Sequence, residues 1–164
     1  MNDNNRFWVD LKNGKFLSMV KESSKGNVLQ SSREAFNVLN PLFADEDDVE
    51  KAFFVFMDQK NRIISIENLF RGSIAGAAIY PREVVKRLIQ LGANAFLFSH
   101  NHPGGDPTPS REDKEITMRI LVAASSIDVS FHDHIIIGET FYSMADEGIM
   151  GSMKEKVQSF MKAI

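Results

Sequence analysis

The sequence predicts an α/β (α+β) domain in which a mixed sheet is flanked by helices. Segments suited to buried strands alternate along the chain with segments suited to amphipathic helices, which is typical of helices packed on a sheet. A length of 164 residues fits one such domain, with at most a short appendage at either end. Hydrophobic residues make up 43% and charged residues 25% of the chain, as is ordinary for a globular protein.

The first part of the chain, residues 1–44, is predicted to be an appendage that is packed on the core or linked to it. Residues 15–22 alternate well enough for a strand. A helix should follow, with a candidate N-cap at Ser31 or Ser32 and an end near residue 40, because proline comes next. The acidic stretch 44–50 then marks a loop or a helix edge before the main body.

The main body, residues 45–148, begins with a predicted hairpin. "AFFVFMD" is a buried strand, "QKN" a turn and "RIISIENLF" a second strand, so the hairpin covers 52–70. A glycine-rich, irregular segment follows at 71–80. "PREVVKRLIQLG" has proline in its first turn, apolar residues on one face and Gly92 at its end, which predicts a helix over 81–91.

The second half of the main body contains the strand expected at the centre of the sheet. "ANAFLFSH" at 93–100 is continuously apolar enough for that position. Residues 101–109 form a loop, and Ser110 opens a helix through about Ser126. "DVSFHDHIIIG" and "TFYSMAD" predict a closing pair of strands, and the chain ends in a helix at 149–164.

The composition excludes several kinds of function. Without cysteine the chain has no disulfide, thiol nucleophile or thiolate metal site, so a metal must be held by histidine, carboxylate, carbonyl or water. The apolar runs are too short to cross a bilayer and the first residues lack a signal peptide, so a cytoplasmic protein with no membrane partner is expected. The net charge of −3 does not favour DNA as a partner, although the modest basic cluster of Arg82, Lys86 and Arg87 leaves a local patch open.

The strongest functional signal is "SHNHPGGDPTPSRED" at 99–113. His100 and His102 stand two residues apart in an extended segment, so their side chains point to the same side and can converge on one ion. Asp113 could be a third ligand, placed in the first turn of a helix, where a negative group is favoured. Catalytic zinc commonly takes three protein ligands and leaves a fourth position to water.

Structural interpretations compete with this one. The loop after the histidines could be a plain turn, and Ser110 followed by Asp113 resembles a helix cap. His132 and His134 form a second His-x-His pair, which would also face one way in a regular strand and is a rival on spacing alone. The seven-residue gap that separates His102 from Ser110 is not repeated after His134.

The complete combination is more specific than its parts. His-x-His, a seven-residue gap and Ser-x-x-Asp, set between a buried strand and a helix, resemble the metalloprotease motif of the JAB/MPN (JAMM) superfamily. "LFRGSI", "YPREVVKRL" and "DHIIIG" resemble its RadC branch, and the resemblance covers roughly residues 45–145. Residues 1–44 do not look like the helix-hairpin-helix region usual in that branch, and Gly104 stands where the branch often has serine.

The resemblance implies a JAB/MPN, cytidine-deaminase-like architecture and a zinc-dependent hydrolase that cleaves amide bonds of a peptide or an isopeptide-linked protein. By that resemblance His100, His102 and Asp113 are zinc ligands, and Ser110 helps to stabilise the oxyanion. The match of "DHIIIG" suggests that His134 lies near the site or braces a ligand.

The resemblance also points to a general base upstream. JAMM proteins carry this glutamate just before a buried strand, and Glu50 holds that position in "EKAFFVFMD", eight residues before Asp58. Glu46 and Glu67 are weaker alternatives, because neither stands at the entry of that strand. Glu50 also ends an acidic run that could be solvated surface.

Two other functions remain open. A DNA-associated, repair-related factor could use the same metal on phosphodiesters, although such cleavage often employs two metals and more carboxylates. A catalytically silent binding domain could retain zinc for structure alone.

Overall fold

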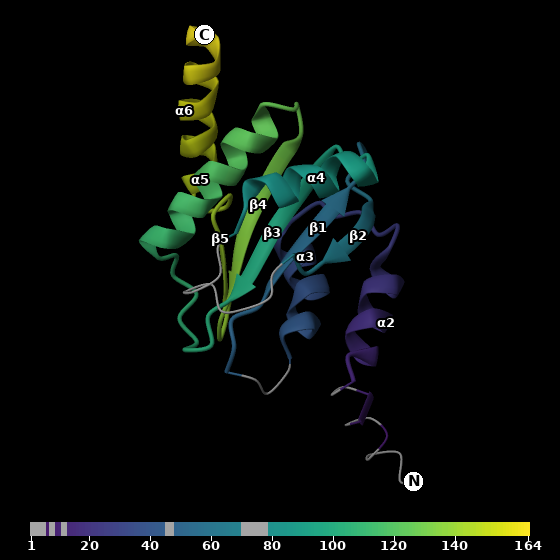
Figure 1. Ribbon diagram of the computed structural model, residues 1–164. Helices are drawn as coiled ribbons and strands as arrows, with labels where there is room; N and C mark the ends of the chain where they lie inside the picture. The colour runs from purple at the N-terminus through teal and green to yellow at the C-terminus, as the bar shows by residue number, and fades with distance from the viewer. Residues whose placement is uncertain (1–5, 7–8, 11–12, 45–47, 70–78) are drawn as a thin grey trace.

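A computed structural model of the chain describes residues 6, 9–10, 13–44, 48–69 and 79–164. These residues form a five-stranded mixed sheet with helices on both faces, which confirms the predicted fold class (Figure 1). The strand order is β2-β1-β3-β4-β5, and β3 and β4 are the one parallel pair among the described strands. The strand bounds are Ala52–Met57 (β1), Ile63–Glu67 (β2), Ala95–Asn101 (β3), Ser130–Ile137 (β4) and Phe141–Ser143 (β5).

The strands predicted in the main body form as expected. β1 and most of β3 are buried continuous apolar runs, the pattern of strands that are covered on both faces. β1 and β2 pair antiparallel, and the Asp58 carboxylate closes their turn by accepting the amides of Lys60 and Arg62 at 2.8 and 3.0 Å. β3 lies between β1 and β4, which confirms its predicted central place.

Three helices cover one face of the sheet, and α4 and α5 cross in front of the strands in Figure 1. Their core is aromatic: the rings of Phe54 and Phe98 on adjacent strands stack with centroids 4.6 Å apart. Gly92 ends α4 at φ 60°, a left-handed conformation that glycine adopts without a steric penalty. The helix bounds are Pro81–Leu91 (α4), Arg111–Ser125 (α5) and Ile149–Ala163 (α6), in agreement with the predicted helices.

The opposite face is covered by the N-terminal segment. Leu39 and Leu42 are fully buried there, and the predicted N-cap is Ser31, whose side chain accepts the Glu34 amide at 3.1 Å. The boundary predicted near residue 45 stays a prediction, and the irregular segment predicted at 71–80 lies almost wholly outside the described residues. The elements are α2 (Lys15–Ser24), α3 (Ser32–Leu39) and the short 3-10 helix η1 (Asn40–Phe43).

The strand predicted over residues 15–22 is wrong, because this segment is the helix α2. Leu17 and Val20 pack against the core beneath the sheet, and Ser24 is buried one turn later. Their spacing of three and four residues follows the helical period. A strand would have placed Met19 on the same buried side as Leu17, but Met19 is largely exposed.

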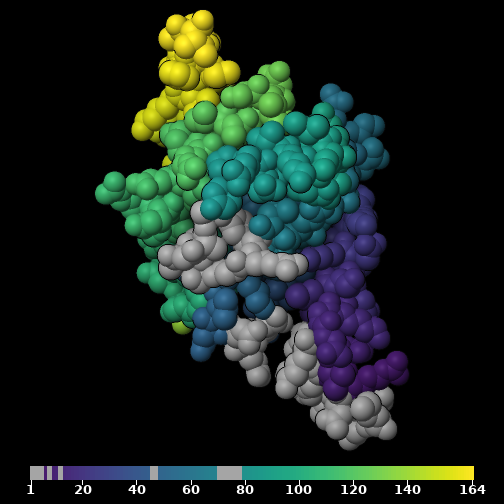
Figure 2. All heavy atoms as spheres, viewed as in Figure 1, coloured from purple at the N-terminus to yellow at the C-terminus, as the bar shows by residue number. Residues whose placement is uncertain are grey.

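The C-terminal helix begins against the body and then leaves it. Met150, Met153 and Val157 are buried, while the last turns of α6 stand clear of the rest of the molecule in Figure 2. None of the helices in the described parts of the chain has the length and apolar character needed to span a bilayer.

Candidate metal centre

The three predicted ligands meet at one end of the central strand. His100 lies near the end of β3, and His102 directly follows the last residue of that strand. Asp113 lies in the first turn of α5. Ser110 begins that helix with a capping box: its hydroxyl accepts the Asp113 amide at 3.1 Å, and its own amide donates to the Asp113 carboxylate at 2.8 Å. The cap therefore aims the Asp113 carboxylate as well as starting the helix.

The loop between the histidines and α5 is held by the turn after β4. The His102 amide donates to the Ile137 carbonyl at 2.7 Å, and the Glu139 amide donates to the Gly105 carbonyl at 2.8 Å. A side-chain carbon at Gly138 would stand 2.1 Å from the Gly105 carbonyl oxygen. Glycine is therefore required at position 138, which explains why the "DHIIIG" segment ends in glycine.

The ligand atoms have the spacing of a single-ion site. The two histidine Nε2 atoms are 2.9 Å apart, and they lie 3.1 and 3.2 Å from the two carboxylate oxygens of Asp113. Ligands at the zinc distance of about 2.0–2.1 Å with tetrahedral angles lie roughly 3.3 Å apart. His100 and Asp113 are buried and His102 is partly exposed, and the three can thus hold one metal ion. Their chemistry of imidazole and carboxylate suits zinc.

The charge of Asp113 is secured by its neighbours. Burial raises the pKa of the Asp113 carboxyl, but the hydrogen bond and charge of His100, together with the Ser110 amide, outweigh it and hold the pKa well below its usual range. The carboxylate therefore stays an anion, which is the form that binds a cation.

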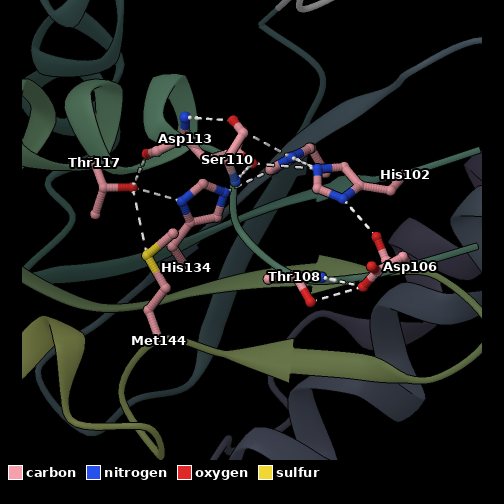
Figure 3. Close-up of polar contacts among 9 residues, drawn as sticks. His102, Asp106, Thr108, Ser110, Asp113, Thr117, His134 and Met144 are labelled. Carbon is pink, nitrogen blue, oxygen red and sulfur yellow. Dashed lines mark hydrogen bonds and ion pairs between the residues drawn. The ribbon is translucent and has the colours of Figure 1, made fainter.

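A chain of buried hydrogen bonds extends behind His100. Its Nδ1 lies 2.7 Å from Nε2 of His134, and Nδ1 of His134 lies 2.6 Å from the Thr117 hydroxyl (Figure 3). Thr117 donates in turn to the main-chain carbonyl of Asp113 at 2.6 Å. We call His100, His134, Thr117 and Asp113 the buried relay, since it links two of the predicted ligands through groups that are all nearly inaccessible to water.

The relay assigns a proton to each group without conflict. The Thr117 hydroxyl uses its hydrogen on Asp113, so it accepts from Nδ1–H of His134, whose Nε2 is then free to accept from Nδ1–H of His100. Burial lowers the pKa of His134 well below its ordinary value, which keeps this ring neutral. With a cation in place of the hydrogen bond to Asp113, His100 can keep its proton on Nδ1 and present the lone pair of Nε2, as a metal ligand must.

His102 is oriented in the same way by a different partner. Its Nδ1 lies 2.8 Å from the Asp106 main-chain carbonyl, an obligate acceptor, so Nδ1 carries the proton and Nε2 faces the site. The Asp106 carboxylate is occupied by the amide and hydroxyl of Thr108 at 2.9 and 2.7 Å, which keeps this turn closed (Figure 3).

The expectation that His132 and His134 face the same way is wrong. The register between β3 and β4 shifts after Phe96, so that an extra residue is accommodated in β4 near His132. His132 reaches the Asn61 side chain at 2.8 Å, whereas the ring of His134 stacks on Phe98 and joins the relay. The second pair therefore does not converge on one ion.

Glu50 stands two residues before β1, the strand whose first residue pairs with His100. Ala52 pairs with His100 in the antiparallel β1–β3 ladder, and the same register continued by two residues would set Glu50 opposite His102. The Asn101 amide still donates to the Lys51 carbonyl at 3.3 Å, so the pairing continues past the end of β1. Oε2 of Glu50 is buried and has no hydrogen-bond partner among the described residues.

The two alternative candidates for the base are Glu67 and Glu46. Glu67 sits on the edge strand β2 and is held by Arg87, whose Nε and Nη2 donate to its carboxylate at 2.7 and 2.5 Å. Glu46 lies outside the described residues. Among the described candidates, Glu50 is thus the one with a buried oxygen that no described residue engages.

A groove of about 430 Å³ runs up to His102. Its walls are the end of the N-terminal segment, the histidine loop and the turn after β4. Asp48 and Glu139 are acidic, and no lysine or arginine stands among its described lining residues. Its apolar lining includes Pro41, Phe43, Pro103 and Ile137.

Sequence reasoning missed Thr117 and Asn101. Thr117 follows Asp113 by four residues and so lies on the same face of α5, a spacing that is visible in the sequence. Its importance depends on His134, which arrives from another strand. Asn101 carries no signal beyond standing between two histidines.

Known proteins are similar to parts of this chain. Residues 29–149 match the family of the RadC-like JAB domain. A UPF0758 protein of Vibrio cholerae is 43% identical over 94 residues, which are 57% of this chain and 60% of that protein. UPF0758 protein YfjY of Escherichia coli is 42% identical over 102 residues, 62% of this chain and 64% of YfjY. A UPF0758 protein of Symbiobacterium thermophilum is 37% identical over 123 residues, 74% of this chain and 52% of that protein. The chain thus spans less than two thirds of the length of these curated relatives.

Proposed function

The chain belongs to the RadC-like JAB domain family, and from this premise we propose that it is a zinc-dependent hydrolase. Its substrate is a peptide or an isopeptide-linked protein, cleaved at an amide bond. One observation carries the proposal: the ligand atoms of His100, His102 and Asp113 lie within 4.8 Å of one another. The general base that the proposal adds is Glu50, whose buried Oε2 has no described partner. A set of three protein ligands is typical of catalytic zinc rather than structural zinc.

The residues of the site have separate roles in amide hydrolysis. Zinc held by His100, His102 and Asp113 would acidify a water molecule and polarise the substrate carbonyl. The Glu50 carboxylate accepts the proton of the attacking water and later returns it to the leaving amine. The Ser110 hydroxyl accepts one bond from the Asp113 amide, which leaves its hydrogen to stabilise the developing oxyanion.

The surroundings of the site favour a peptide over a nucleic acid. The groove beside His102 carries two carboxylates and no described cation, which suits neither a phosphodiester nor a DNA backbone. A single carboxylate in the ligand set is also fewer than two-metal phosphodiester cleavage normally employs. We therefore put DNA second to a peptide as the substrate.

Metal analysis and matched variants test this proposal. Protein purified without chelator should hold about one zinc per chain, and His100→Ala, His102→Ala and Asp113→Ala should each lose most of it. His132→Ala is the control, because His132 contacts Asn61 and none of the three ligands. A control variant that loses zinc while the three ligand variants keep it would contradict the assignment.

The role of Glu50 is tested separately from metal binding. Glu50→Gln should retain zinc and fold but slow the hydrolysis of peptide or isopeptide-linked substrates by roughly two or more orders of magnitude, the scale of a lost general base. Single-turnover rates and zinc content are measured on the same preparation. Hydrolysis at the wild-type rate would rule Glu50 out as the base.

A further inference from the structure

We propose that Asn101, the residue between the two histidines, positions Glu50 by clamping the peptide groups on both sides of it. Oδ1 of Asn101 accepts the Lys51 amide at 2.6 Å, and Nδ2 donates to the Val49 carbonyl at 3.3 Å. The Val49 carbonyl belongs to the peptide bond that precedes Glu50, and the Lys51 amide to the bond that follows it. This inference rests on the proposed function, in which Glu50 is the base.

The bonds require a carboxamide. A main-chain amide can only donate and a carbonyl can only accept, so the two partners together fix the orientation of the Asn101 side chain. Aspartate would keep the acceptor for Lys51 and lose the donor for Val49. Alanine would lose both bonds.

The clamp holds a part of the backbone that the sheet hydrogen bonds no longer hold. Residues 48–50 have no regular secondary structure, and the pairing of β1 with β2 begins only at Phe54. On the other side, the ladder with β3 ends at Ala52, followed by the longer 3.3 Å bond from the Asn101 amide to the Lys51 carbonyl. The side chain of Asn101 therefore holds the backbone of residues 49–51, which precede β1 and include Glu50, where the sheet hydrogen bonds have ended.

The location of Asn101 couples the base to the metal site. Asn101 is covalently joined to His100 and His102, so its clamp ties the backbone of Glu50 to the backbone of two ligands. The distance between a base and the water that it deprotonates must be kept within tenths of an ångström for efficient proton transfer. Asn101 is a positioning residue in this proposal, since it acts through Glu50.

Hydrogen exchange tests the clamp without any substrate. In Asn101→Ala the Lys51 amide should exchange roughly tenfold faster, the effect of losing about one net hydrogen bond, while amides within β1 and β3 keep their protection. Asn101→Asp should restore the protection of Lys51, because a carboxylate oxygen still accepts that bond. Unchanged exchange of Lys51 in Asn101→Ala would overturn the proposal.

Kinetics test whether the clamp serves Glu50. Asn101→Ala should keep its zinc and lower kcat roughly 10- to 100-fold with little change in KM, because the base is misplaced and substrate binding is not. Asp58→Ala is the matched control: it removes a side-chain clamp on main-chain amides at the opposite end of the same strand and should leave kcat unchanged.

A double-mutant cycle separates this inference from the proposed function. If Asn101 acts through Glu50, Asn101→Ala should cost nothing further in a Glu50→Gln background. Additive losses, or loss of zinc from Asn101→Ala, would mean that Asn101 supports the ligands instead and would overturn the inference. A fully active Asn101→Ala beside an inactive Glu50→Gln would overturn it while leaving the proposed base intact, whereas a fully active Glu50→Gln would remove the base itself.

Discussion

Replacing Thr117 by valine should weaken metal binding at a site that Thr117 never touches. The substitution keeps the shape of the side chain and removes one buried hydroxyl, which bonds Nδ1 of His134 and the Asp113 carbonyl at 2.6 Å each. Thr117 is fully buried, so water cannot replace the lost partner. The relay is then broken at its centre.

Two outcomes are open to His134 in this variant, and both are costly. If it keeps its proton on Nδ1, that donor is buried without an acceptor, which costs about 1–3 kcal/mol of folding free energy. If the proton moves to Nε2, this atom becomes a donor toward Nδ1 of His100 and drives the His100 proton onto Nε2. A protonated Nε2 cannot bind a metal, so zinc can bind only by reversing this shift and leaving Nδ1–H of His134 without an acceptor. The free energy that the metal-free form gains from the proton shift is thereby lost from zinc binding.

The expected loss of zinc affinity is roughly 10- to 100-fold, the usual effect of removing a group that orients a metal ligand. The stabilisation that saturating zinc gives to the folded state should therefore shrink by about 1.4–2.7 kcal/mol. Affinity is measured by competition with a chelating dye, and stability by urea unfolding with zinc and with chelator.

Thr117→Ser is the matched control, since it keeps the hydroxyl and loses only a methyl group. It should bind zinc nearly as tightly as wild type, although the small cavity costs some stability in both metal states. If Thr117→Val bound zinc within about twofold of Thr117→Ser, the relay would have no part in orienting His100 and the reasoning would be refuted.

Two further predictions concern stability and the histidine loop. Burial raises the pKa of Asp133 to about 6, so the folded protein keeps a proton that the unfolded chain releases above its ordinary pKa near 4. Stability should therefore fall as the pH rises through that window, by up to about 3 kcal/mol, and Asp133→Asn should flatten the fall; identical urea-unfolding profiles of both proteins between these pH values would disprove this. Gly138→Ala should displace the loop and lower both zinc affinity and thermal stability, because its new carbon would stand 2.1 Å from the Gly105 carbonyl oxygen. Gly104→Ala, where nothing lies within 4 Å, should leave both unchanged, and equal effects of the two variants in a dye-competition assay and thermal scan would contradict the packing argument.

Local rules in the sequence predicted the strands, the helices of the main body and the grouping of the ligands. The period of two residues puts His100 and His102 on one side, and the Ser110 cap puts Asp113 at the start of α5, so neighbours in sequence decide most of this geometry. The same kind of reasoning failed for α2, because ten residues with few apolar positions fit either period until the sheet selects which of them to bury.

The tertiary structure alone decided which polar groups serve the site. His132 and His134 are equivalent by spacing, and an irregularity in the pairing of β3 with β4 separates them. The bonds of His134 to His100 and of Asn101 to Val49 join residues 34 and 52 positions apart, so no local pattern could reveal them. Periodicity and capping are encoded over one or two turns of chain, whereas a buried polar group must find its partner wherever the fold supplies one.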